Sequence, residues 1–509
     1  MSAGKIVFRN TVFSYTRTLI SAALTLFSSR WILAELGASD YGVYGLAGGL
    51  LFFVSFISSI LSQGSGRYLA YATGTGDPEE VTKWFNAALN VFSCLPFILV
   101  PIGLAIGEIV VRFVLKIDSL RLSAALWVFR CSLVSFLAVM LATPFLSLLV
   151  AKQKIHIAAM LMLFHSIGLF IIALVLPRLP GDHLVVYAVL VATSLVMLQI
   201  LYIMVCRQIC PEARVVFSYW WDIDKIKALI GFSGWLCVGT IGTVVNTQGQ
   251  GVLLNLMKGT AANAGSSVAG ALAGQMQTLA NAFLQAISPE VIRREGASNH
   301  SGMISLAKQA TKLGVAFIML VALPLFCECE YVLKLWLVNP PPYAVFFARI
   351  AILSALFYKM AVGHRICFQA TGRIKSQQII ELLVYAATAP LVGVVYCVSR
   401  SVYISFSFVP VMQAVYFLAT VMAGARIYEW NLKDVIVSVF LKSLICFLLG
   451  IALFSSICML CPTHSFMRLC FSTAMLCLFV CIYFILFVLS DTDKKRVASC
   501  FAKIINMVV

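Results

Sequence analysis

The stretch NTVFSYTRTLISAALTLFSSRWILAELGASDYGVYGLAG, residues 10–48, decides what kind of protein this chain is. It is long and apolar enough to cross a bilayer, which takes about 20 residues, although it contains Arg17 and Arg30. A cation at the bilayer centre costs roughly 2.5–3.5 kcal/mol on insertion scales, so it usually faces a wet cavity or a partner. Polar side chains recur on one helical face, at Ser14, Arg17, Ser21, Thr25 and Ser28. The stretch therefore predicts a membrane helix with a polar, cationic face.

The composition extends this prediction to the whole chain. Of its 509 residues, 61% are hydrophobic and only 11% are charged. Soluble domains are about 45–50% apolar and about 25% charged, so the chain is predicted to be an all-α polytopic membrane protein. Polar residues, Gly and Pro divide the apolar sequence into about fourteen predicted transmembrane helices, which leave no room for a sizeable soluble domain. The first helix is predicted to be retained, because no small-residue cleavage site follows it.

The basic residues indicate the orientation in the membrane. With the N-terminus inside, most of the 37 Lys and Arg residues fall in cytoplasmic segments, Arg365 among them. Far fewer fall in outer loops, which include Arg112, Arg121 and Arg468. The positive-inside rule then places both termini in the cytoplasm and explains the net charge of +17 without nucleic acid. The tail 491–509 is basic and amphipathic, which predicts that it lies on the cytoplasmic membrane face.

An internal repeat predicts two lobes. LAELGASDYGVYGLAGG (33–49) resembles NLMKGTAANAGSSVAGA (255–271), and the same spacing relates Gln63 to Gln285. Six helices per repeat would give two parallel lobes, with substrate bound at their interface. The predicted organisation is an N-lobe at 1–210 with helices 1–6, a C-lobe at 211–430 with helices 7–12, helices 13 and 14 at 431–490, and the tail.

Polar residues follow the predicted cavity helices of both repeats. Span two offers Gln63 and Arg67 on adjacent turns. Spans seven and eight carry stripes at helical spacing: Ser233, Cys237, Thr240, Thr243, Thr247 and Gln250, then Thr278, Asn281, Gln285 and Ser288. Helix packing explains the small Ser, Thr and Gly residues as well as a cavity does. For the amides and the arginines a solvated cavity is the better interpretation.

Buried charges add two further hypotheses. Cations outnumber acids within the spans, so the interior favours an anionic ligand. Glu381 is the clear internal acid, and two roles are open for it: an ion pair with Lys359, or proton or Na⁺ coupling. For Arg130 we predict a local structural role. The Cys and His spacings resemble no metal site, and no cofactor is expected.

Five segments give the chain a family resemblance. They are LFSSRWILAELGASDYGVYGL (26–46), FSGWLCVGTIGTVVNTQGQGVLLN (232–255), GQMQTLANAFLQAISPEVIRREG (274–296), YVLKLWLVNPPPY (331–343) and QATGRIKSQQ (369–378). The chain resembles the Wzx-type (O-antigen) oligosaccharide flippases of the multidrug/oligosaccharidyl-lipid/polysaccharide (MOP) exporter superfamily. The resemblance implies two pseudo-symmetric six-helix lobes of MATE type, with helices one, two, seven and eight lining the cavity, plus two C-terminal helices.

The resemblance also implies a function. The cargo would be a polyprenyl-diphosphate-linked glycan, flipped from the cytoplasmic to the outer leaflet of the bacterial inner membrane for surface polysaccharide assembly. Partners would be membrane lipid, a polysaccharide polymerase and other glycan assembly proteins. Arg17 and Arg67 would contact the diphosphate, since guanidinium groups bind phosphate bidentately. Arg30 would either assist in the outward state or act as an anchor. The remaining cavity residues would be Gln63, Ser21, Thr25, Thr247, Gln250, Asn281 and Gln285.

Competing functions remain. A cation-coupled drug or metabolite antiporter and a lipid II flippase belong to the same superfamily. An antiporter for cationic compounds should have acidic groups in its first lobe, where this chain has Arg17 and Arg67. A membrane enzyme would need a large outer loop with catalytic residues, and a channel would need a filter pattern. The expectation is therefore a transporter and not an enzyme.

Overall fold

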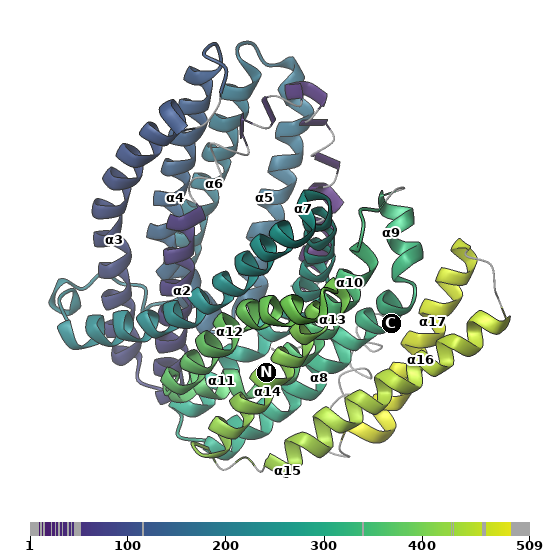
Figure 1. Cartoon of the computed structure of the whole chain (residues 1–509). Helices are drawn as coiled ribbons and strands as arrows, with labels where there is room; N and C mark the ends of the chain where they lie inside the picture. Colours follow the sequence, from purple (N-terminus) through teal and green to yellow (C-terminus); the bar gives the residue numbers. More distant parts are fainter. Residues whose placement is uncertain are drawn as a thin grey trace, which may run out of the picture. The chain divides into compact units, whose positions relative to one another are not determined.

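A computed structural model describes most of the chain. It covers 52–114, 117–337, 340–428, 430, 432–460 and 465–489, and, before these, 10, 13, 16–21, 23–25, 27–28, 31–32, 34–37, 40–41 and 43–44. Within these residues the regular elements are helices, and none is a strand (Figure 1). The all-α prediction is confirmed.

The helices follow one another with short connections. The first group is α2 (Phe52–Thr75), α3 (Pro78–Ile109), α4 (Leu122–Ala151), α5 (Ile155–Val175), α6 (His183–Ile209) and α7 (Ile223–Gly296). The second group is α8 (His300–Cys327), α9 (Cys329–Leu337), α10 (Ala344–Met360), α11 (Val362–Thr371), α12 (Lys375–Ser399), α13 (Val402–Phe406), α14 (Phe408–Ala425), α15 (Leu432–Val435), α16 (Lys442–Leu460) and α17 (Phe466–Tyr483). Short π and 3₁₀ segments are η1 (Val110–Val114), η2 (Leu176–Arg178), η3 (Phe217–Tyr219), η4 (Ile436–Leu441) and η5 (Phe484–Val488).

Many of these helices have the length and composition of membrane spans. Within the described residues 10 helical segments qualify, or 11 if α10 and α11, bent by 44° at their junction, count as one span. The chain is therefore a polytopic membrane protein, and the predicted number of fourteen is not confirmed.

Helix α7 contains a reversal of direction. In a straight helix Leu229 and Arg293 would be about 96 Å apart. Both nevertheless lie against α2, where the backbone oxygens of Leu229 and Arg293 come close to Gly64 and Gly74. These two glycines are only about 15 Å apart along their helix. The two halves of α7 therefore run as two passes, in agreement with the prediction of two separate spans here, spans seven and eight, at about 224–256 and 260–292.

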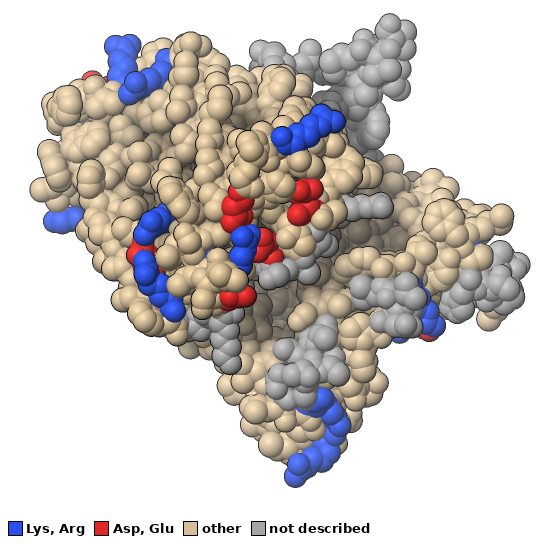
Figure 2. All heavy atoms as spheres, turned by 90° about the horizontal axis from the view of Figure 1, so that it is seen from above, with Lys and Arg blue, Asp and Glu red and all other residues tan. Residues whose placement is uncertain are grey.

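The structure divides into two compact units. The first contains Met1–Ser233 and Ile292–Ser298, and the second contains Gly234–Val291 and Asn299–Val509. The predicted lobe limits at 210 and 430 remain predictions, and the α16–α17 pair belongs to the second unit. Charged side chains gather into a few clusters on the face drawn in Figure 2, where most of the other surface is neither acidic nor basic.

The first unit is centred on α4, which packs against α2, α3, α5 and α6. Phe85, Phe92, Phe129 and Met140 are fully buried between these helices. Gly107 of α3 lies directly on the Phe129 ring, so a side chain there would displace the ring. Large apolar side chains and one close glycine contact thus hold α3 on α4.

The second unit brings α7 close to α12. Gly239 lies against the Gln378 side chain, and Gly242 lies against the Leu382 backbone. Because glycine has no Cβ, the two backbones approach closely, as small residues allow between membrane helices. This approach places the polar side chains of α7 beside those of α12.

A buried ion pair fixes the C-terminal helices to the second unit. Arg468 of α17 donates to both carboxylate oxygens of Glu328, at 3.0 and 2.7 Å, and Ser472 donates to the same group at 3.1 Å. The Arg468 and Glu328 side chains are only 5% and 1% exposed. Arg468 was predicted to lie in an outer loop, but it lies in the first turn of α17, where its charge is buried against Glu328.

Candidate functional site

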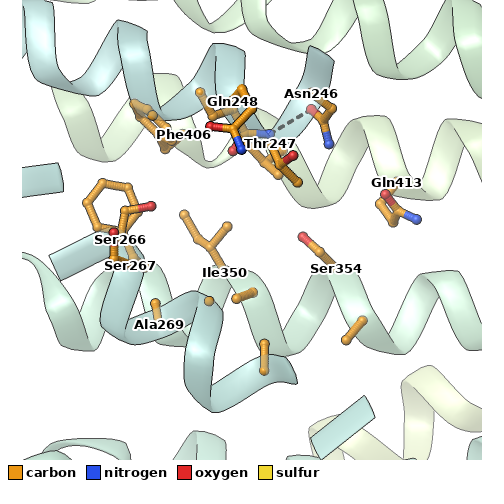
Figure 3. Close-up of a pocket in the computed structure, with 18 of the residues that line it drawn as sticks. Asn246, Thr247, Gln248, Ser266, Ser267, Ala269, Ile350, Ser354, Phe406 and Gln413 are labelled. Atoms are coloured by element: carbon orange, nitrogen blue, oxygen red, sulfur yellow. Dashed lines mark hydrogen bonds between the residues drawn. The ribbon is translucent and has the colours of Figure 1, made fainter. Parts of the chain in front are cut away.

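A cavity of about 790 Å³ opens within the second unit (Figure 3). Both halves of α7 line it, together with α10, α12, α13 and α14. Its polar lining consists of amides and hydroxyls: Thr243, Asn246, Thr247, Gln248, Gln250, Ser266, Ser267, Gln277, Ser354, Tyr358, Tyr385 and Gln413. The stripe predicted on span seven therefore faces a cavity at Thr243, Thr247 and Gln250.

The lining has a particular chemistry. Among the described residues that line it, none is Asp, Glu, Lys or Arg. Apolar surface comes from residues such as Ile350 and Phe406, which lie beside the amides in Figure 3. Gln250 donates to the Asn246 amide oxygen at 2.7 Å, and Thr247 donates to the Thr243 carbonyl at 3.0 Å. The cavity thus suits an uncharged molecule with many hydroxyl groups more than a cation.

A buried carboxylate lies one side chain behind this lining. Glu381 is 5% exposed and accepts hydrogen bonds from Gln377 at 2.6 Å and from Tyr416 and Thr243 at 3.4 Å each. Gln377 and Glu381 are four residues apart and share one face of α12. Because Thr243 also lines the cavity, the network connects the carboxylate to it.

A second hydrogen bond continues this network at the cavity wall. The Gln413 amide donates to the Tyr385 hydroxyl at 2.8 Å, and both residues line the cavity. The Tyr385 ring lies 5.2 Å from the Tyr416 ring. Sequence reasoning missed Gln413, Tyr416 and Tyr385. These residues could have been found from the sequence, because they are polar and lie at helical spacing within the apolar spans that contain α12 and α14.

The predicted ion pair between Lys359 and Glu381 is wrong. The Lys359 ammonium, 1% exposed, donates to the Asn281 side chain, while Glu381 is bound by hydroxyl and amide donors. The sequence could not show which helices α10 faces, and α10 meets the second half of α7 at this position. Asn281, which is itself exposed, thereby accepts a hydrogen bond from a lysine, and its place in a substrate cavity remains a prediction.

Arg365, which was predicted to lie in a cytoplasmic segment, is also close to the cavity. It lies partly buried on α11, with its guanidinium carbon 4.4 Å from the centre of the Tyr358 ring. Tyr358 lines the cavity. The two residues are seven positions apart in the sequence, about two helical turns, and this spacing was the only indication in the sequence that they could meet.

The first unit contains the other predicted residues. Arg17 contacts the Met162 sulfur, and the Ser21 hydroxyl lies 2.9 Å from that of Ser166. This face of the first predicted helix therefore packs against α5, as small polar residues do between membrane helices. Thr25 donates to the Ser21 carbonyl at 2.7 Å.

Arg67 has aromatic surroundings. It is 8% exposed, and its guanidinium carbon lies 4.4, 5.4 and 5.2 Å from the rings of Tyr68, Tyr71 and Phe232. Gln63, one turn earlier, is exposed. The Arg67 contacts are cation–π interactions that hold α2 to the start of α7. Its role toward a phosphate remains a prediction.

Two predicted residues receive no side-chain description. Arg30 lies outside the described residues, and Gln285 belongs to α7 but its side chain is likewise outside them. Among the residues that the structure does describe, no group of three or more His, Cys, Asp or Glu side chains has the geometry of a metal site.

Comparison with known proteins defines the fold. No protein-family model matches the chain, and no curated protein matches it in sequence. A MATE crystal structure in the bent conformation is similar with a TM-score of 0.72 and 14% identity, over 85% of this chain and 97% of that one. A MOP superfamily transporter from Pyrococcus furiosus gives 0.67 and 12%, over 86% and 97%. The MATE transporter ClbM in complex with Rb⁺ gives 0.65 and 16%, over 85% and 96%. This chain therefore has the MATE fold of MOP superfamily transporters, and these similar structures are transporters rather than enzymes.

Proposed function

We propose that this protein flips a polyprenyl-diphosphate-linked oligosaccharide from the cytoplasmic to the outer leaflet of the bacterial inner membrane by alternating access. One observation carries the proposal: the polar residues described in the lining of the second unit's cavity present amides and hydroxyls, and none of the described lining residues is charged. The family resemblance in the sequence and the transporter fold agree with it.

The cavity suits sugars for two physical reasons. Asn, Gln, Ser and Thr side chains both donate and accept hydrogen bonds, so they replace water around a hydroxyl without adding a fixed charge. Tyr358, Tyr385 and Phe347 add aromatic surface, which packs against apolar faces. The volume of about 790 Å³ lies within the range of small-molecule sites, about 300–1,000 Å³.

The diphosphate requires cations, and the described residues that line this cavity include none. Arg17 supplies one in the first unit: it is only partly buried, and its partners, the Met162 sulfur and the Thr18 hydroxyl, are uncharged. Arg67 is more enclosed, among three rings. We assign Arg17 the larger share of phosphate binding.

Gene deletion in the native host tests the proposal. The expected result is loss of surface polysaccharide and accumulation of polyprenyl-diphosphate glycan on the cytoplasmic face. Complementation with Arg17→Ala should fail although the protein is inserted, whereas Arg178→Ala, an exposed arginine between α5 and α6, should restore transport. Normal surface glycan in the deletion strain would refute the proposal.

A cation-coupled antiporter is the second candidate, and the buried Glu381 favours it. Its donors among the described residues are hydroxyls and an amide, and a buried carboxylate of this kind can exchange a proton or bind Na⁺. An antiporter predicts altered drug resistance in the deletion strain, with surface glycan unchanged. Glu381→Gln should then abolish the dependence of transport on the ion gradient.

A further inference from the structure

Three charged side chains form a cluster on the exposed surface of the first unit. Arg130 of α4 donates to Glu108 of α3 through Nε at 2.9 Å and Nη2 at 2.6 Å. Arg112, in η1, approaches the other carboxylate oxygen to 3.9 Å. The Arg112 and Arg130 side chains are each 46% exposed. Two guanidinium groups share one carboxylate, so the cluster carries one net positive charge.

A groove leads away from this cluster along α3. It has a volume of about 490 Å³ and is lined by Pro101, Leu104, Ala105, Glu108, Ile109 and Arg112. From Arg112 to Pro101 it follows α3 for about 16 Å. One end is charged, and the rest is apolar.

The surroundings of the groove belong to the lipid-exposed part of a membrane span. Along α3, Ile98, Ile102 and Ile106 are 59%, 49% and 57% exposed. The span Pro78–Phe113 has 36 residues, about 54 Å, which is longer than the roughly 30 Å hydrocarbon core. Arg112 lies at its very end, where a span of this length would reach the headgroup level, and Pro101 lies deeper along it. Trp127, 48% exposed and three residues before Arg130, is of the type that occupies this boundary.

We propose that this cluster and groove bind an anionic phospholipid. Its phosphate accepts hydrogen bonds from Arg112 and Arg130, and one acyl chain lies along the groove toward Pro101. The order of charged and apolar parts along α3 matches the order of headgroup and chain in a lipid that stands upright in the membrane. The net positive charge selects an anionic headgroup over a zwitterionic one, because Glu108 already neutralises one of the two arginines. The site is separate from the transport cavity, and the proposal does not depend on the cargo.

Native mass spectrometry of the purified full-length protein tests this site. Phosphatidylglycerol or phosphatidylcholine is added at equal concentration, and the retained lipid is counted for the wild type and three variants. Arg112→Gln should reduce phosphatidylglycerol retention about tenfold, the loss expected for a hydrogen bond to a charged group. Arg178→Gln, the control, should leave it unchanged, and Glu108→Gln should keep or raise it.

The folding of Arg112→Gln is not at issue, because its side chain is half exposed and its ion pair is long. Its thermal stability without added lipid should equal that of the wild type, which separates lipid binding from folding. Equal retention of phosphatidylglycerol by Arg112→Gln and the wild type would overturn the proposal. Equal retention of phosphatidylcholine and phosphatidylglycerol by the wild type would overturn it as well.

Discussion

The buried pair Glu328–Arg468 gives the sharpest prediction. Substituting Arg468 by Met removes two hydrogen bonds, at 3.0 and 2.7 Å, and leaves the Glu328 carboxylate, 1% exposed, with Ser472 as its remaining partner among these bonds. Breaking one side of a buried ion pair costs about 3–5 kcal/mol, because the other charge stays buried. This loss of stability should weaken the packing of α17 against α8.

The partner variants separate the pair from its packing. Glu328→Leu combined with Arg468→Met removes both charges, and replacing a buried ion pair by apolar residues is often neutral or stabilising. We therefore expect the double variant to be markedly more stable than Arg468→Met alone. Ser472→Ala, which removes one hydrogen bond to the carboxylate, should cost about 1–3 kcal/mol.

The assay is thermal unfolding in detergent, followed by size-exclusion fluorescence, together with amide hydrogen exchange along α16 and α17. Arg468→Met should lower the unfolding midpoint and raise exchange in α17 before α4 of the first unit responds. An unchanged midpoint for Arg468→Met, or a double variant no more stable than it, would show that the pair does not hold these helices.

Three other predictions concern separate sites. Gly242→Ala should destabilise the protein by about 1–3 kcal/mol in the same thermal assay, because the added Cβ would come 2.7 Å from the Leu382 Cα. Gly234→Ala, the control, has open space at its Cβ and should leave the stability unchanged. Equal effects of the two substitutions would refute the close approach of α7 and α12. Arg67→Lys should retain more stability than Arg67→Ala, since a lysine keeps part of the cation–π interaction with Tyr68, and equal melting would contradict this role. The pKa of Glu212 is lowered: burial, the largest single influence, would raise it, but the hydrogen bond from Lys152 at 2.7 Å, a backbone hydrogen bond and the charges of Lys152 and Lys154 together outweigh burial. These interactions therefore stabilise the fold above pH 4.5, and the stabilisation is lost as the pH falls through the lowered pKa. Glu212→Gln should remove that acid dependence from a stability profile, and an unaltered profile would refute it.

The sequence anticipated the cavity helices better than the partners of individual charges. Thr247 and Gln250 were predicted from helical spacing and face the cavity. An ion pair with Lys359 was one of two roles left open for Glu381, yet Lys359 binds Asn281, 78 residues away along the chain. Helical spacing specifies which residues share a face, whereas the element that this face meets depends on how the helices pack.

The sequence also failed to predict side-chain contacts in the first unit, and for the same reason. Glu108 was not recognised as the partner of Arg130, although a local structural role was expected for that arginine. Arg17 and Ser21 were placed on one face correctly, but the meeting of Ser21 with Ser166 depends on how the first helix lies against α5. Neither contact leaves a signal in local spacing, because each joins residues far apart in the chain.

The sequence by itself determined that this is a helical membrane protein, because apolar runs long enough to cross a bilayer leave the backbone no other means of satisfying its hydrogen bonds. It also determined which helix faces are polar, because the helical repeat is a property of the chain alone. Only the tertiary structure decided that the residues described in the cavity lining of the second unit are uncharged, with Glu381 behind them and Lys359 bound to Asn281. These outcomes depend on which helices approach closely, and the close approach follows from long-range packing at positions such as Gly239 and Gly242.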